Sequence, residues 1–199
     1  MGLDRDKYLD LNEVKQLRTV TEAQCIIDLK KGRTKGILTW MVVDMALGTG
    51  LRVAELAQLK IEDINFKRGS LKVVRVKKKK KTRETLAIGK DLLNHLREYL
   101  EWLDETKGHL FLGQRGRLSA QGLQQIWKRA IERAGLPKEL SIHSARHTCG
   151  THLLRKTKNL RQVQKQLGHA SPVITANMYA DVSFDDMQEG MNGLYDDEQ

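Results

Sequence analysis

Residues 61–88, IEDINFKRGSLKVVRVKKKKKTRETLAI, differ from the rest of the chain in the spacing of their apolar residues. They contain three short β-like runs, at Ile61–Phe66, Leu71–Val76 and Thr85–Ile88, and Arg68-Gly69 is a turn signal between the first two. The lysine run Lys77–Lys81 falls at the second turn. This stretch therefore predicts a small three-stranded antiparallel sheet.

Helical periodicity dominates on both sides of this sheet. Before it, we predict a helix from Leu11 to near Gly32, a buried helix over Ile37–Leu47 and a short helix over Arg52–Leu56. After it, we predict helices that begin at Lys90 or extend over Ser119–Ala134, Ser144–Lys156, Asn159–Leu167 and Pro172–Tyr179. The predicted fold class is α+β, mainly α, with one small sheet in a helical domain.

Composition limits the kind of partner and the cellular setting. The chain has 199 residues, 40% of them apolar, which is enough to bury a core, and its formal net charge of +10 favours an anionic partner such as nucleic acid. Cys25 and Cys149 lack the spacing of metal ligands, and packing is the simpler role for both. No apolar stretch is long enough for a signal peptide or a membrane span, so we expect a cytoplasmic protein.

One string of polar residues suggests phosphate chemistry. In His143-Ser144-Ala145-Arg146-His147, an imidazole and a guanidinium lie three residues apart, where one helical face could bring both to one phosphate. Opening a phosphodiester without a metal needs a nucleophile, cations around the non-bridging oxygens and an acid for the leaving alkoxide. Taken alone, the string is a weak motif, because a helix start that carries His and Arg is more often a capped, solvated terminus.

Four blocks in order resemble the signature motifs of the tyrosine recombinase, or phage integrase, family. They are Leu47–Leu56 (LGTGLRVAEL), His143-x-x-Arg146-His147, Leu167-Gly168-His169 and Met178-Tyr179. The resemblance spans roughly residues 10 to 182 and makes a solvated helix start a poor explanation of His143 and Arg146. It implies the DNA breaking-rejoining fold of a tyrosine recombinase catalytic domain.

The resemblance also implies a domain organisation. We expect the catalytic domain to occupy residues 1–182, and residues 183–199 to form a C-terminal helix and acidic tail. That helix could dock in trans on a neighbouring subunit or pack on its own domain. The N-terminal core-binding domain of relatives is expected to be absent, so that the chain is either a fragment or a short recombinase.

The family pattern assigns roles to five residues of this sequence. Arg52 and Arg146 would hold the non-bridging oxygens of the scissile phosphate with their planar guanidinium groups. His143 resembles the acid-base residue, and His169 the second histidine, which supports the phosphate by hydrogen bonding. Tyr179 resembles the nucleophile. A surface ion pair with Glu55 is the alternative role for Arg52.

The catalytic lysine is implied to lie on the turn of a β-hairpin, where it protonates the departing 5′ oxygen. Counting back from Thr85 makes Lys79 the best match and Lys81 the second, although the glycine often found in this turn is missing. The other cations around the turn are expected to contact the DNA backbone: Lys77, Lys78, Lys80, Lys81 and Arg83.

The implied activity is site-specific DNA recombination or integration, by strand cleavage and rejoining through a 3′-phosphotyrosyl intermediate, as in the recombinases of phages and other mobile elements. It requires no cofactor and no metal. The implied partner is double-stranded DNA, on which the family assembles as a homotetramer, and we expect a monomer alone. Two alternatives are DNA relaxation of the type IB topoisomerase kind and a noncatalytic DNA-binding relative.

Overall fold

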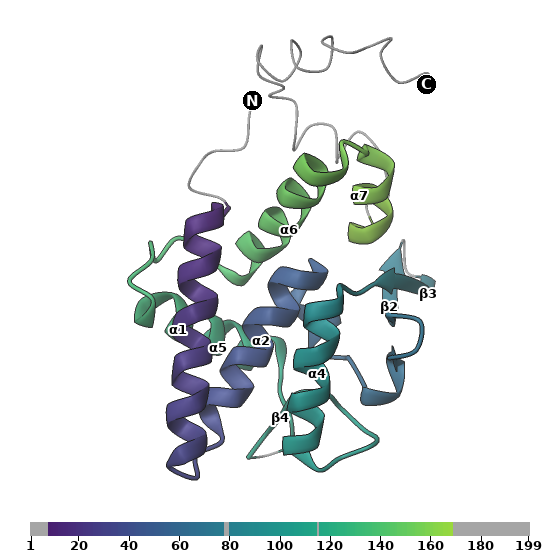
Figure 1. The fold of residues 1–199 in the computed structure, drawn as a ribbon. Coiled ribbons are helices and arrows are strands. Elements are labelled where there is room, and N and C mark those ends of the chain that lie inside the picture. Colours follow the sequence, from purple (N-terminus) through teal and green to yellow (C-terminus); the bar gives the residue numbers. More distant parts are fainter. Residues whose placement is uncertain (1–7, 78–79, 115, 169–199) are drawn as a thin grey trace, which may run out of the picture.

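The protein, as seen in a computed structural model, is described over residues 8–77, 80–114 and 116–168. Figure 1 shows helices gathered around a central helix, with a small sheet on one side. The helices are α1 (Leu11–Lys30), α2 (Lys35–Thr49), α3 (Val53–Leu56), α4 (Lys90–Leu103), α5 (Ala120–Arg133), α6 (Ile142–Thr157) and α7 (Leu160–Leu167). The predicted mainly helical α+β class is confirmed.

Helix α2 forms the centre of the core. It packs against α1, α4, α5 and α6, and its residues from Trp40 to Ala46 are all buried. A helix that is apolar on most of its faces needs neighbours on every side. The predicted buried helix is thus confirmed.

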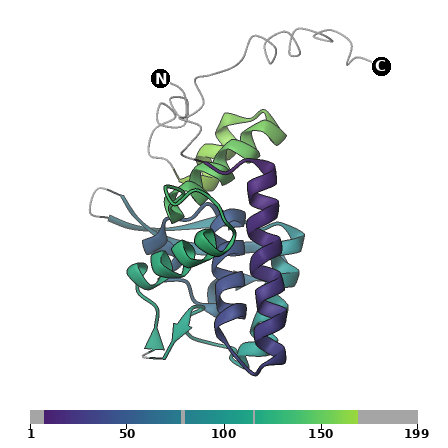
Figure 2. The same ribbon diagram turned by 90° about the vertical axis from the view of Figure 1, so that its left-hand side faces the viewer.

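The small sheet consists of β1 (Ile64–Asn65), β2 (Ser70–Lys77) and β3 (Lys80–Ala87), antiparallel and in that order. Two predicted boundaries were wrong. Ile61–Asp63 forms a 3₁₀ turn, so the first strand has only two residues. The third strand begins at Lys80 instead of Thr85, because the hairpin extends beyond the helices, where exposed polar residues pair as well as apolar ones (Figure 2).

A second sheet was not predicted. Strands β4 (Leu112–Gly113) and β5 (Gly116–Arg117) pair in antiparallel fashion between α4 and α5. Two residues per strand are too few for an alternating pattern to be visible in the sequence.

Helix α6 begins at Ile142, two residues before the predicted start at Ser144, with Ser141 as the N-cap. This shift places His143 within the first turn of α6. The predicted helix Pro172–Tyr179 and the proposed C-terminal helix in 183–199 lie outside the described residues. None of the helices in the described ranges combines the length and the apolar character needed to cross a bilayer.

Candidate active site

The turn after α2 brings three distant segments together. Gly50 ends α2 with a positive φ of 64°, a conformation that glycine adopts without strain. A Cβ at this position would lie 2.6 Å from Leu167 Cδ2 and 3.0 Å from Cys149 Sγ. The end of α2 therefore lies in close contact with α6 and with the end of α7.

Arg52 follows this turn as the N-cap residue of α3, and Glu55 orients it. One Glu55 oxygen accepts the backbone N–H of Arg52 at 2.9 Å, and the other accepts from the guanidinium Nη1 at 2.9 Å. The ion pair that the sequence offered as an alternative role is thus present. The Arg52 side chain remains 46% exposed while that of Glu55 is 9% exposed, so a buried carboxylate holds a guanidinium that still faces solvent.

Arg146, on α6, is buried and binds two helix ends. Its Nη1 donates to the Gly50 carbonyl at 2.8 Å, and its Nη2 donates to the Leu167 carbonyl at 2.8 Å. Because a guanidinium has five N–H donors in a fixed plane, these two hydrogen bonds also set the direction of the remaining N–H groups of Arg146. Arg146 therefore lies next to the turn that carries Arg52, and the two predicted phosphate ligands share one side of the molecule.

His143 lies one turn before Arg146 on α6 and is exposed. Its place in the first turn of a helix favours anions nearby, since unpaired backbone N–H groups and the positive end of the helix dipole are found there. His147, the next histidine of the motif, is partly buried and has an interaction partner. The exposed imidazole is thus the one available to an approaching phosphate.

A third guanidinium, which sequence analysis did not single out, lies at the same place. Arg75 of β2 is 1% exposed, and its Nη2 donates to the Gln166 carbonyl at 2.8 Å. Its Nε lies 3.3 Å from Glu84 Oε2 on β3. The strand alternation offered a signal, because Arg75 shares the buried face of β2 with Leu71 and Val73.

The three arginines affect one another electrostatically. The pKa of Arg146 is lowered to about 10, first by burial and then by the nearby positive charge of Arg52, with Arg75 contributing as well. Burial also lowers the pKa of Arg75. Guanidinium groups are cationic near neutral pH. The Glu55 and Glu84 carboxylates offset part of the charge of the three arginines, and the remaining positive charge favours an anion at this place.

The hairpin of β2 and β3 carries several of the predicted DNA contacts. Lys77 pairs with Lys80, and Val76 pairs with Lys81. Lys81 is exposed and lies within β3. Arg83 is also exposed on β3.

Three of the predicted catalytic residues, Lys79, His169 and Tyr179, lie outside the described residues, as does Lys78. What precedes His169 is well defined. Gly168 ends α7 with a φ of 65°, and its N–H donates to the Gln164 carbonyl at 2.8 Å. The structure therefore fixes the helix end from which residue 169 continues.

The two thiols have the packing role that the sequence favoured. Cys25 is buried in the core and Cys149 is partly buried against Gly50. Burial raises the pKa of each thiol to about 11. Neither thiol is a nucleophile near neutral pH.

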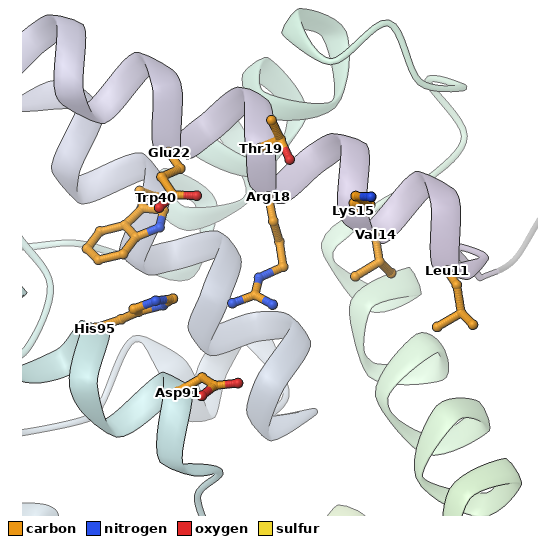
Figure 3. A pocket seen from close by; sticks show the side chains of 9 residues that line it. All are labelled: Leu11, Val14, Lys15, Arg18, Thr19, Glu22, Trp40, Asp91 and His95. Carbon is orange, nitrogen blue, oxygen red and sulfur yellow. The ribbon is translucent and has the colours of Figure 1, made fainter.

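A separate hollow of about 410 Å³ lies between α1, α2 and α4 (Figure 3). Two of its lining residues bind the buried Asp44 carboxylate, which accepts from Arg18 Nε at 2.8 Å and is hydrogen-bonded to His95 Nδ1. The Trp40 and His95 rings lie beside each other with centroids 4.8 Å apart. The lining residues are Leu11, Val14, Lys15, Arg18, Thr19, Glu22, Trp40, Asp91 and His95, and they include none of the predicted catalytic residues. The charges here join three helices.

The chain is similar to known proteins over almost its whole length, including the segments around Arg146. The sequence profile of the Phage integrase family matches residues 7–186, nearly the whole chain. The chain belongs to the phage integrase family. Its three family motifs that fall in the described residues, around Arg52, Arg146 and Gly168, are the segments that the turn at Gly50 brings into contact.

Individual relatives agree with this membership. The chain is 35% identical over 160 residues to a tyrosine recombinase XerD of Corynebacterium glutamicum, covering 77% of the chain and 51% of that protein. It superimposes on a crystal structure of XerA recombinase with a TM-score of 0.73 at 24% identity, covering 94% of the chain and 65% of that structure. It also superimposes on XerH site-specific recombinase bound to difH substrate with a TM-score of 0.69 at 25% identity, covering 92% of the chain and 53% of that structure. The chain spans about half the length of the curated relatives it matches.

Proposed function

We propose that this chain is the catalytic part of a site-specific DNA recombinase, which cleaves and rejoins DNA through a covalent bond between Tyr179 and a 3′ phosphate. The observation that carries the proposal is the buried Arg146 guanidinium, which is bound to the Gly50 and Leu167 carbonyls beside the turn that carries Arg52. Family membership and the relatives' names support the same activity.

The two arginines are suited to one phosphate. Arg146 uses two of its N–H groups on carbonyls and Arg52 uses one on Glu55, which leaves N–H groups of both to donate to non-bridging oxygens. Such donors stabilise the charge that develops on these oxygens in the transition state. His143 is exposed at the start of α6, three residues before Arg146 on the same helix, and is the proposed acid-base residue for the same group.

The proposed reaction is a transesterification. The Tyr179 oxygen attacks phosphorus as its proton passes to His143, the bond from phosphorus to the 5′ oxygen breaks, and Lys79, or His143 in turn, gives a proton to that oxygen. His169 supports the phosphate by hydrogen bonding. Attack by a 5′ hydroxyl on the phosphotyrosine then reverses these steps and rejoins the strand. Each step breaks one phosphoester bond and forms another, so the phosphotyrosyl ester conserves the bond energy and the proposed reaction needs no cofactor.

The proposed partner is double-stranded DNA. Lys77, Lys78, Lys80, Lys81 and Arg83 would contact its backbone from the hairpin, and XerH is a relative whose structure holds its DNA substrate. Neutralisation of phosphates by these cations predicts an affinity that falls steeply with salt. We further propose a catalytic domain over residues 1–182, a docking segment in 183–199, and assembly of four copies on DNA in the cytoplasm.

The test is covalent trapping. Duplexes with a nick near the centre and randomised flanking sequence are incubated with the protein, because a short cleaved fragment dissociates and leaves the protein attached. Adducts that survive denaturing detergent are isolated, their DNA is sequenced to recover the preferred site, and the modified peptide is identified by mass spectrometry. We expect a single phosphotyrosine, at Tyr179.

Matched variants decide the outcome. Tyr179→Phe should abolish the adduct, whereas Tyr8→Phe and Tyr195→Phe should retain it. An adduct that persists in Tyr179→Phe, or a wild-type protein that binds the nicked duplexes without ever forming one, would overturn the proposed function.

A further inference from the structure

The carbonyls at the end of α7 are held by two buried arginines. Arg146 donates to the Leu167 carbonyl and Arg75 donates to the Gln166 carbonyl, each at 2.8 Å. The last carbonyls of a helix have no partner within the helix, and cations near them are stabilised by the helix dipole. Both arginines therefore bind the segment that leads into the family motif Leu167-Gly168-His169.

Arg75 is a costly residue at its position. It occupies a buried site on β2 where strand alternation favours an apolar side chain. Its Nε and Nη1 atoms are buried, and neither has a hydrogen-bond acceptor within the part of the chain that the structure describes; the nearby Glu84 carboxylate faces Nε as an ion pair. A well-packed apolar residue would avoid the desolvation of the guanidinium, so packing alone does not explain Arg75.

The guanidinium also lies directly against Gly168. A Cβ added at Gly168 would lie 1.1 Å from Arg75 Nη1 and 2.1 Å from its Cζ. The position therefore requires glycine twice: for its φ of 65°, and because Arg75 fills the space of any side chain. The glycine of the Leu-Gly-His motif, at the end of helix α7, is explained by a residue on strand β2.

Two further hydrogen bonds hold the same helix end against the base of the hairpin. Gln166 Nε2 donates to the Ala87 carbonyl of β3 at 3.2 Å and to the Thr49 carbonyl of α2 at 3.4 Å. Arg75 itself lies four residues before Lys79 in the chain. The end of α7 and the hairpin thus form one unit, with Arg75 at their junction.

We propose that Arg75 is a positioning residue of the recombinase site, which fixes the step from α7 to His169 relative to the hairpin that carries Lys79. This inference rests on the proposed function and adds a residue to it. Arg75 acts through His169 and Lys79 and not directly on DNA, because its own N–H groups are covered by Gly168 and the end of α7 and do not reach solvent.

The test compares Arg75→Met and Arg75→Lys with Lys72→Met, which removes an exposed cation from the same strand. DNA affinity and single-turnover cleavage are measured on the site recovered by trapping. We expect both Arg75 variants to bind DNA within about twofold of the wild type, because no phosphate contact is lost. Their cleavage should slow about 10- to 100-fold, since small misplacements of catalytic groups have effects of this size. Lys72→Met should cleave as the wild type does.

A double-mutant cycle with His169→Ala separates positioning from general damage. If Arg75 acts through His169, adding Arg75→Met to His169→Ala should slow cleavage by less than about threefold more, whereas independent effects would multiply. Should Arg75→Met fail to fold in a thermal melt, Arg75→Lys, which keeps the charge and most of the length, decides the cycle.

Three results would overturn the inference: wild-type cleavage in Arg75→Lys, multiplicative effects in the cycle, or a loss of DNA affinity with a reduced salt dependence, which would mark Arg75 as a direct phosphate contact. Each of these presupposes a wild-type protein that forms the Tyr179 adduct. Absence of that adduct would instead refute the proposed function itself.

Discussion

Replacement of Gly50 by alanine tests how closely the end of α2 approaches α6 and α7. The new Cβ would lie 2.6 Å from Leu167 Cδ2 and 3.0 Å from Cys149 Sγ, closer than carbon and sulfur atoms tolerate. Overpacking of this kind costs about 1–3 kcal/mol. The φ of 64° adds about 1–2 kcal/mol for a residue with a Cβ. The free energy of unfolding should therefore fall by about 2–5 kcal/mol.

Gly135→Ala is the matched control. Gly135 has nearly the same φ, 66°, but nothing lies within 4 Å of its added Cβ. The backbone strain and the effect of alanine on the unfolded chain are common to both variants, so the difference between them isolates the crowding. Urea unfolding followed by circular dichroism at 222 nm measures both. Equal losses of stability in the two variants would refute the close approach of Leu167 to Gly50.

Three other substitutions test separate contacts. Glu55→Gln should slow adduct formation about tenfold, because the Arg52 guanidinium loses a charge-assisted bond of about 1.5–3 kcal/mol; an unchanged single-turnover rate would show that Glu55 does not orient it. Tyr99→Phe should cost about 1–2 kcal/mol by leaving the buried Leu110 carbonyl unpaired. Burial also raises the pKa of Tyr99 above its ordinary value of 10.0. The stabilisation that the neutral hydroxyl provides is therefore fully present below pH 10 and is lost as the pH rises above that value. In urea titrations, the free energy of unfolding of Tyr99→Phe should fall less steeply at alkaline pH than that of the wild type. Asp44→Asn should lower stability by about 2–3 kcal/mol, because the carboxylate joins α1 to α4 through α2; an unchanged urea midpoint would mean that this charge cluster does not stabilise the domain.

Sequence periodicity predicted the parts of the fold where one face of an element is buried. The stripe of apolar residues in Ser119–Ala134 corresponds to α5, and Ser119 accepts the Gly122 N–H as an N-cap at 3.1 Å. The helix predicted to begin at Lys90 is α4, and Tyr99 is buried within it. The predicted third strand was too short because the outer residues of the hairpin are lysines. A lysine run has no alternation of apolar and polar residues, although its backbone still pairs.

The candidate site was predicted from motifs, and only part of its construction follows from them. Arg52 and Arg146 were assigned by resemblance, and their common location is what the fold adds. The role of Arg75 was missed because its partners, the Gln166 carbonyl and Gly168, lie more than 90 positions away in the chain and are backbone groups without a sequence signature. A charged residue at a buried strand position was the sole indication.

The anchoring of Arg146 to the Leu167 carbonyl has a consequence for biosynthesis. During translation, Arg52 and Arg146 leave the ribosome before the helix end that receives Nη2 has been made. A nascent or prematurely terminated polypeptide thus holds its guanidinium groups without the acceptor that aims them. In such a polypeptide the Gly50 carbonyl is the acceptor already present, so one hydrogen bond instead of two sets the direction of the remaining Arg146 N–H groups.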